Sequence, residues 1–256
     1  MPWMRLRLEW RLADGRRKCR RCGRRYRLRT AWDACRLPGR VKHALVQRFV
    51  WGVPVYRQRF APLASRPTTE RFYRLLRAVM AQSEQLRAPF AGALECDETS
   101  FGRARKGKRG WGAAGKVLVF GVVQRNGLVK AQPIPAHDRV SVMRVIQAES
   151  REGALYYTDE WQAYATLRLR GDHVVVRKQK GRPLGRDHIN GIEGFWSYAK
   201  NGLYPYRGVP RKHFHLDLGE ICYRFNHRSD NLKPLLVKLL KTTNSNDLQE
   251  TLVQNS

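Results

Sequence analysis

Acidic residues are scarce in this chain of 256 residues, where 21 Asp and Glu face 50 Lys and Arg and leave a formal charge of +29. Such an excess of one sign opposes compaction unless a polyanion neutralises part of it. The excess is mostly Arg, whose guanidinium binds phosphate through two parallel hydrogen bonds. We therefore expect the partner to be nucleic acid rather than an anionic membrane surface.

Long apolar runs are missing as well. The longest, Val117 to Val123, is far shorter than the ~20 residues that a membrane-spanning helix needs. The first residues, MPWMRLRLEW, alternate charged and apolar side chains and lack the apolar stretch of a signal peptide. We expect neither a membrane partner nor secretion, and a cytoplasmic, nucleoid-associated location. Hydrophobic residues still make up 42% of the chain, which is enough for a packed core.

Cysteine is rare too. An odd count of five at scattered spacing fits a reducing compartment better than a disulfide framework. Cys19 and Cys22, in KCRRCGRRY, look like one knuckle of a zinc ribbon. A structural zinc needs four ligands, and Cys35 and His43 could supply the other two. The alternative is a degenerate ribbon without zinc, whose basic run 16–29 contacts phosphate.

Changes in the residue pattern divide the chain into four regions. We expect a basic zinc-ribbon-like or degenerate segment at 1–40, a helix-turn-helix at 41–88, an α/β domain at 89–229, and a C-terminal helix with a frayed tail at 230–256. No internal repeat is evident.

Apolar residues at helical spacing over 41–50 predict the first helix of the helix-turn-helix, and a second short segment runs from about Pro54 to Ala64. The turn SRPTT then begins a third helix, in which Arg71, Arg74 and Arg77 lie on the face opposite the apolar one. The alternative is an ordinary three-helix bundle with a basic surface.

The α/β region shows the order three antiparallel strands, helix, strand, helix, strand, helix. ALECDETSF forms the first strand, and VLVFGVVQRNGLVKAQPIP forms a hairpin that turns at Asn126-Gly127. A helix covers 139–149, GALYYTDE forms a strand, WQAYATLRLR a helix and HVVVR the fifth strand. This order predicts a ribonuclease H-like fold, a mixed sheet with helices on its faces.

Against this basic background, three acids occupy informative positions. Asp97 lies mid-strand, where a charge is costly unless it is paired or binds a metal ion. Asp159 ends the fourth strand, and Glu193 opens a helix that also carries Lys200, two turns further on. If the first and fourth strands are neighbours, the three carboxylates converge. Pairing with the many basic residues is the alternative for any single acid.

Converging carboxylates repel one another unless divalent cations neutralise them. Two Mg²⁺ ions, or Mn²⁺ in their place, can activate a nucleophile and stabilise the leaving oxygen in phosphoryl transfer. Glu98 and Glu160 directly follow the two aspartates. If the aspartates point into the site, strand alternation points these neighbours away, so they are secondary candidates.

Five motifs give the chain a family resemblance: CRRCGRRY, ECDETSFGRARKGKRGWGAAGK, YYTDEWQAY, HINGIEGFWSYAK and EICYRFNHR. The chain resembles the DDE-type transposases of bacterial insertion sequences, in particular the ISXO-like group with its ribonuclease H-like catalytic domain. The resemblance covers most of the chain and implies that Asp97, Asp159 and a third residue hold the catalytic metal ions.

The third position has two candidates, because related sequences use either Glu or Asn there, with a Lys on the same helix. Glu193 is favoured, since a carboxylate binds Mg²⁺ better than an amide and its spacing to Lys200 suits the family. Asn190 is expected either to cap the helix or to give an oxygen to the second metal ion.

Other features suggest contacts with DNA. The Gly-rich basic stretch 103–116 suits phosphate contacts near the cleavage site, through Arg105, Lys106, Lys108, Arg109 and Lys116. Trp161 and Trp196 either fill the core, which we favour, or stack on bases. Glu220 and Arg224 match a family signature of structural or DNA-backbone character.

We therefore expect a transposase that binds element ends, cleaves DNA and transfers the strands, as a homo-oligomer on DNA. One alternative is a ribonuclease H-like nuclease or resolvase without strand transfer. Another is an inactive or domesticated DNA-binding descendant of a transposase.

Overall fold

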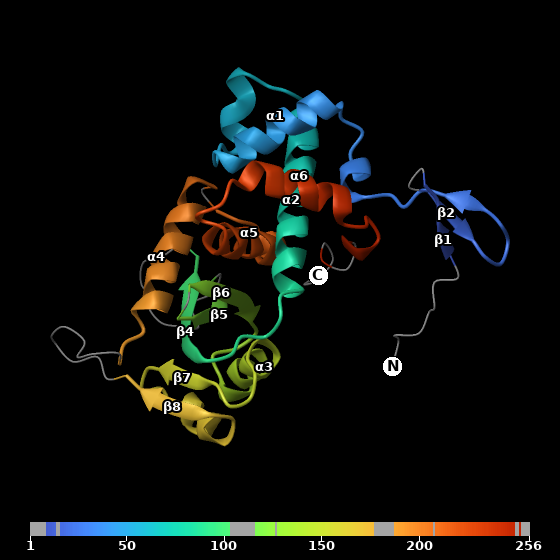
Figure 1. Cartoon of the computed structure of the whole chain (residues 1–256). Helices are drawn as coiled ribbons and strands as arrows, with labels where there is room; N and C mark the ends of the chain where they lie inside the picture. Colours follow the sequence, from blue (N-terminus) through green and yellow to red (C-terminus); the bar gives the residue numbers. More distant parts are fainter. Residues whose placement is uncertain are drawn as a thin grey trace.

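The computed structural model describes residues 9–13, 16–102, 116–125, 127–176, 187–206, 208–248 and 251. Two sheets, one small and one of five strands, and two groups of helices make up this part of the chain (Figure 1). The small antiparallel sheet near the N-terminus has three strands: β1 (Glu9–Arg11), β2 (Arg17–Cys19) and β3 (Arg25–Tyr26). Among the described residues, no helix is both long enough and apolar enough to cross a membrane.

The central sheet is mixed and has the strand order β6-β5-β4-β7-β8. Its strands are β4 (Ala93–Phe101), β5 (Val117–Gln124), β6 (Leu128–Ile134), β7 (Leu155–Thr158) and β8 (Asp172–Val175). The first three strands are antiparallel, whereas β7 and β8 run parallel to β4. The predicted adjacency of the first and fourth strands is thus confirmed. This mixed α/β arrangement is compatible with a ribonuclease H-like fold.

Helices cover both faces of the sheet. On one face, α3 (Arg139–Glu149) and η3 (Gln162–Leu169) pack on alternate residues of β4 and β5, such as Leu94, Cys96 and Val122. On the other, α4 (Asn190–Leu203) and α5 (Phe214–Asn226) pack on Val119 and Val123. The expected helix after β7 is a 3-10 helix rather than an α-helix. Two short 3-10 helices, η4 (Tyr204–Tyr206) and η5 (Arg211–His213), connect α4 to α5.

A second group of helices comes from both ends of the chain (Figure 1). It contains η1 (Ala31–Ala34), α1 (Gly39–Val50), η2 (Val55–Phe60), α2 (Arg66–Gln85) and α6 (Leu232–Thr242). Phe49, Phe72 and Leu76 share one core with Leu236 and Leu240 of α6. The C-terminal helix therefore belongs to the same packed unit as the predicted helix-turn-helix.

The expectation of a frayed tail after α6 is wrong for residues 243–248. The backbone N–H of Ala31 donates to the carbonyl of Thr243 at 2.9 Å, and Ser245 N–H donates to the carbonyl of Arg29. Leu248 is 1% exposed and joins the helical core. Polar composition misled the prediction, because the backbone pairing and one leucine hold this segment in place.

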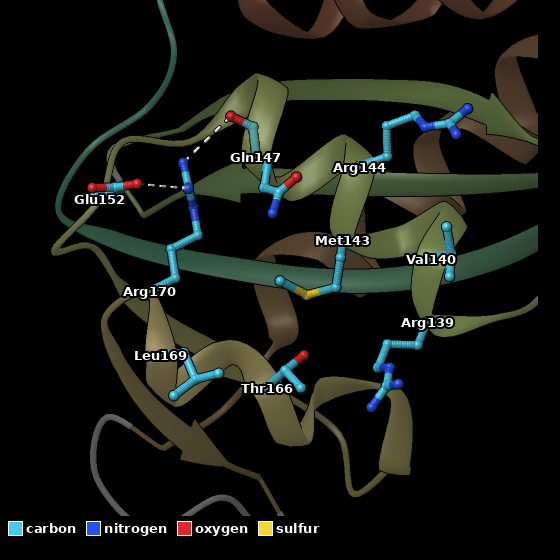
Figure 2. Close-up of a pocket in the computed structure, with 9 residues that line it drawn as sticks. All are labelled: Arg139, Val140, Met143, Arg144, Gln147, Glu152, Thr166, Leu169 and Arg170. Atoms are coloured by element: carbon cyan, nitrogen blue, oxygen red, sulfur yellow. Dashed lines mark hydrogen bonds and ion pairs between the residues drawn. The ribbon is translucent and has the colours of Figure 1, made fainter.

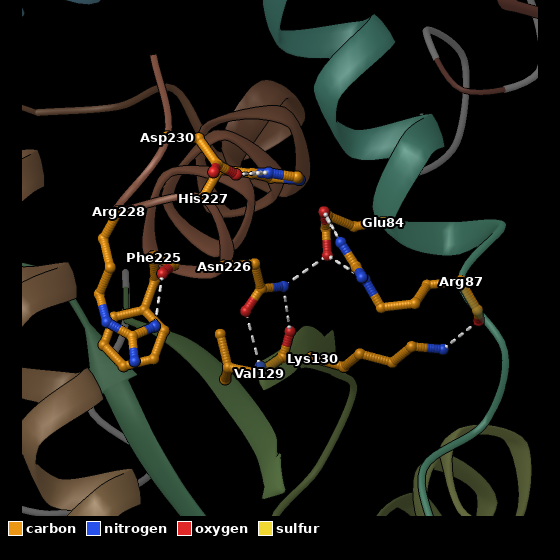
Figure 3. Close-up of polar contacts among 9 residues, drawn as sticks. All are labelled: Glu84, Arg87, Val129, Lys130, Phe225, Asn226, His227, Arg228 and Asp230. Carbon is orange, nitrogen blue, oxygen red and sulfur yellow. Dashed lines mark hydrogen bonds and ion pairs between the residues drawn. The ribbon is translucent and has the colours of Figure 1, made fainter. Parts of the chain in front are cut away.

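Helix α5 joins the sheet to the helical unit, because it contributes side chains to both cores. Near its C-terminal end, the Asn226 amide accepts from the N–H of Val129 and donates to the carbonyl of Val129 and to Glu84 (Figure 3). One turn and a half earlier, Glu220 accepts from Arg77 of α2 and from Arg224, each at 2.7 Å. The EICYRFNHR motif is thus a structural connection in this fold.

Candidate active site

Asp97 lies in β4 on the face that packs against α4. Trp196 of α4 is 4% exposed, and its indole N–H donates to Asp97 Oδ2 at 3.0 Å. The indole ring lies over Gly121, the residue of β5 opposite Asp97, where a Cβ would come within 2.7 Å of it. Gly121 therefore leaves the space that lets the indole reach the aspartate. Trp196 fills the core, as favoured, and also fixes one oxygen of Asp97.

Asp159 follows β7 directly, at the turn that leads away from the sheet. Its Oδ1 accepts a hydrogen bond from the backbone N–H of Trp161 at 3.1 Å. Since β7 runs parallel to β4 with Tyr157 opposite Glu95, the chain reaches Asp159 beside the level of Asp97. The geometry expected from the strand order thus brings Asp97 and Asp159 together.

Glu98 joins these two aspartates, although it leaves β4 on the face opposite Asp97, as strand alternation predicts. One carboxylate oxygen from each of Asp97, Glu98 and Asp159 lies within 4.8 Å of the others. Glu98 contacts Tyr164 on the face of β4 that also carries Leu94 and Cys96, and its long side chain brings a carboxylate oxygen back to the two aspartates. A signal for Glu98 was present in the sequence, namely a second acid in a mid-strand position.

Two neighbours hold the Glu98 carboxylate, which is 4% exposed. The Tyr164 hydroxyl donates to Oε2, and His137 Nε2 lies 2.9 Å from Oε1. Burial, together with the charge of Glu98, keeps the pKa of Tyr164 well above its usual value, so this hydroxyl remains a donor. The His137 ring stacks on Trp161 with 3.9 Å between centroids, so Trp161 packs within the protein here.

The donor set suits a hard divalent cation. Oxygen ligands from carboxylates are those that Mg²⁺ and Mn²⁺ prefer, and three carboxylates this close would repel one another without a positive charge between them. Asp97, Glu98 and Asp159 therefore fit the divalent metal ions that the sequence resemblance implies.

The two candidates for the third ligand lie in the first turn of α4. Asn190 and Glu193 are both exposed, and neither belongs to the three-carboxylate group. Asn190 does not cap the helix, because the N-cap residue is Ile189 and the Ile192 N–H donates instead to Glu95 of β4. Lys200 lies exposed further along the same helix.

The basic residues predicted to contact DNA differ in their exposure. Arg71 and Arg74 are exposed on α2. Arg77 is 14% exposed and pairs with Asp217 and Glu220, so the structure gives it an internal role in place of the predicted DNA contact. Lys116 is half-buried just before β5. The remaining basic residues of the Gly-rich stretch lie outside the described residues: Arg105, Lys106, Lys108 and Arg109.

The cysteine pair forms a tight turn between β2 and β3. The Gly23 N–H donates to the Cys19 carbonyl, and Gly23 has a φ of 68°. Within the described part of the chain, no third Cys, His or carboxylate joins Cys19 and Cys22 in a metal-binding group.

A basic groove extends from the vicinity of the site between α3 and η3 (Figure 2). It encloses about 520 Å³ and begins at Arg139, two residues after His137. Arg144 is exposed along it, while Arg170 at the far end donates to the carbonyls of Gln147 and Ser150. Arg139 and Arg144 are both exposed in this groove, and Arg139 follows His137, the partner of Glu98, by two residues.

Comparison with known proteins identifies a family for the region that contains this site. The ISXO2-like transposase domain matches residues 88–226, just over half of the chain. An uncharacterized transposase-like protein of Haemophilus influenzae is 28% identical over 95 residues, which are 37% of this chain and 77% of the relative. A chain of the simian T-cell lymphotropic virus intasome in complex with PP2A regulatory subunit B56 gamma matches with a TM-score of 0.30 and 13% identity. That match covers 62% of this chain and 57% of the viral one.

Proposed function

The chain belongs to the ISXO2-like transposase family, and on this premise we propose that it cleaves DNA at the ends of an insertion sequence and joins the 3′ ends to a target. The observation that carries the proposal is the meeting of Asp97, Glu98 and Asp159 at the end of β7. This group lies inside the matched region.

Asp97 and Asp159 would hold the divalent metal ions, with Glu98 beside them. When bound, Mg²⁺ would make a water or a DNA 3′-hydroxyl easier to deprotonate, and it would neutralise charge on the leaving oxygen. The protein's own part is to fix the carboxylates. The indole N–H of Trp196 donates to one oxygen of Asp97 and the Trp161 N–H to one oxygen of Asp159, and these bonds fix the orientation of the two carboxylates.

Glu193 is our choice for the remaining ligand, and Asn190 is the alternative. Both lie in the turn of α4 nearest the sheet, and a charged oxygen binds Mg²⁺ better than an amide oxygen. Lys200 cannot bind a metal ion, since an ammonium has no free electron pair. Its role would be to hold a DNA phosphate close to the carboxylates.

Recognition of DNA would fall to two basic surfaces. Arg71 and Arg74 on α2 belong to the segment with helix-turn-helix spacing, and Arg139 and Arg144 line the groove between α3 and η3. Phosphate contacts of this kind position a duplex without reading its sequence. The net charge of +29 supports such binding along a large surface.

The test is an assay of the full chain with labelled element ends, Mg²⁺ and a target plasmid. We expect joined products from the wild type and from the control Asp172→Asn, an exposed aspartate of the same sheet. Asp97→Asn and Asp159→Asn should lose cleavage and still shift labelled DNA. Cleavage by either variant would refute the assignment. Nicks without joining would indicate a nuclease, and a shift without cleavage by the wild type would indicate a DNA-binding relic.

The same assay decides the third ligand. Glu193→Gln should raise the barrier by about 2–4 kcal/mol, the loss typical of one electrostatic stabiliser. Asn190→Ala should cost much less, like Asn201→Ala, its exposed control on the same helix. If Asn190→Ala is inactive at every Mg²⁺ concentration while Glu193→Gln cleaves normally, the site uses Asn190.

A further inference from the structure

The first turn of α4 is held by a buried carboxylate that the metal site leaves unused. Glu95 is 2% exposed and lies two residues before Asp97, on the same face of β4. Its Oε2 accepts from the backbone N–H of Ile192 at 3.0 Å. A helix begins with N–H groups that lack partners inside the helix, so a negative charge there stabilises it. Glu95 therefore supplies the cap that the N-cap residue, Ile189, lacks.

Arg125 completes the attachment. Its Nε donates to Glu95 Oε1 at 3.2 Å, and its terminal nitrogen donates to the carbonyl of His188, just before α4, at 2.6 Å. The guanidinium also lies 3.5 Å from the ring centroid of Tyr157 in β7. One buried ion pair thus connects both strands of the site to the segment that leads into α4.

Gly191 makes the close approach possible. A Cβ at this position would lie 2.8 Å from Glu95 Oε2, so any larger residue would displace the carboxylate from the Ile192 N–H. Gly194, one turn later, has nothing within 4 Å of the same position. The helix therefore carries one glycine that the contact requires and one that it does not.

We propose that Glu95 is a positioning residue, which fixes the first turn of α4 at the level of Asp97 and so places the third metal ligand. This inference rests on the proposed function, because it assumes that Glu193 or Asn190 serves the site. The bond between Glu95 and Ile192 joins residues 97 positions apart, and it holds the start of α4 against the strand that carries Asp97. Outer partners of metal ligands typically change metal affinity by about 10- to 100-fold when they are replaced.

Four variants of the full chain test the proposal: Glu95→Gln, Glu95→Ala, Gly191→Ala and Gly194→Ala. Three measurements are made on each: hydrogen exchange of the amides of residues 190–196 without metal, the melting temperature, and the Mg²⁺ concentration for half-maximal cleavage. Glu95→Gln keeps an oxygen for the Ile192 N–H, whereas Glu95→Ala keeps none. Glu149→Gln, which breaks the ion pair with Lys130, controls for general loss of stability.

We expect Glu95→Ala and Gly191→Ala to speed exchange in the first turn and to raise the Mg²⁺ requirement by about 10- to 100-fold. Glu95→Gln should fall between these and the wild type, and Gly194→Ala and Glu149→Gln should leave the Mg²⁺ requirement unchanged. A merely structural role would lower the melting temperature without moving the Mg²⁺ requirement, and that result would overturn the proposal, as would unchanged exchange in Gly191→Ala.

Different results would contradict the proposed function and the positioning role of Glu95. If Asp97→Asn still cleaves DNA, the proposed function is wrong, and with it this role of Glu95. If Asp97→Asn is inactive while Glu95→Ala and Gly191→Ala keep the normal Mg²⁺ requirement, only the positioning role is wrong.

Discussion

Each of the two aspartates accepts a hydrogen bond from a neighbour at one of its carboxylate oxygens. For Asp97 this donor is a side chain, the indole of Trp196, and for Asp159 it is the backbone N–H of Trp161. Hydrogen bonds to ionised groups contribute about 1.5–3 kcal/mol, and they also fix the direction of the remaining oxygen. Trp196 through its indole and Trp161 through its backbone therefore orient the two aspartates.

Replacing Trp196 by Phe tests this view at a single residue. Phe keeps most of the apolar contact over Gly121 but cannot donate to Asp97. We expect single-turnover cleavage to slow by about 10- to 100-fold, in proportion to a lost bond to a charged group. Binding of labelled ends should stay normal. Trp32→Phe, in the helical unit, is the matched control. Cleavage at the wild-type rate would show that the indole N–H does not orient Asp97.

A compact cluster of charged side chains joins α5 to α2. Arg77 of α2 pairs with Asp217 at 3.0 Å and with Glu220 at 2.7 Å, and all three side chains are largely buried. Burial raises the pKa of Asp217 to about 7; Glu220 adds to the rise, while Arg77 and, more weakly, Arg74 oppose it. Two acids thus compete for one buried guanidinium.

This cluster predicts a pH dependence of stability. Between about pH 4 and pH 7 the folded chain keeps a proton on Asp217 that the unfolded chain has lost, so the free energy of unfolding should fall as the pH rises through this window. Asp217→Asn mimics the protonated form and should remove this part of the dependence. Urea unfolding at pH 5 and pH 8 measures it, with Asp172→Asn as control. An equal slope in Asp217→Asn and wild type would contradict the prediction.

The elements also show what the sequence could predict. Periodic apolar residues and turn signals were enough for β4 to β8, for α3 and for α4, and strand order placed Asp97 next to Asp159. The place of Glu98 beside the aspartates was not predicted, because alternation gives the face of the strand but not how far a long side chain reaches back to its edge. The role of Glu95 was missed because its partner Ile192 is 97 positions away and no local pattern encodes that contact. Arg77 was misjudged because its acids come from α5, far along the chain.

With a net charge of +29, the molecule should bind DNA with an affinity that depends strongly on salt concentration. Each phosphate contact releases condensed counterions, so DNA affinity falls steeply with salt. The groove between α3 and η3 is one candidate surface for these phosphate contacts, since the exposed Arg139 and Arg144 line it (Figure 2).

The double variant Arg139→Ala, Arg144→Ala tests that place. Loss of two phosphate contacts should lower the slope of log affinity against log salt by about 2 and weaken binding to all duplexes alike. The control is Arg228→Ala, whose guanidinium is committed to the carbonyls of Gly127 and Phe225. Titrations of labelled duplex from low to high salt measure the slopes. Equal slopes in the double variant and the control would exclude the groove from the DNA path.

The Asn226 contact seen in Figure 3 has a consequence for assembly. β6 is one of the two edge strands of the sheet. The backbone N–H and C=O groups of an edge strand that face away from the sheet can pair with another strand. The Asn226 amide occupies both outward groups of Val129, and Pro133 further along the strand has no N–H to offer. A strand from a second copy of the chain therefore cannot pair with β6 at Val129 without first expelling Asn226.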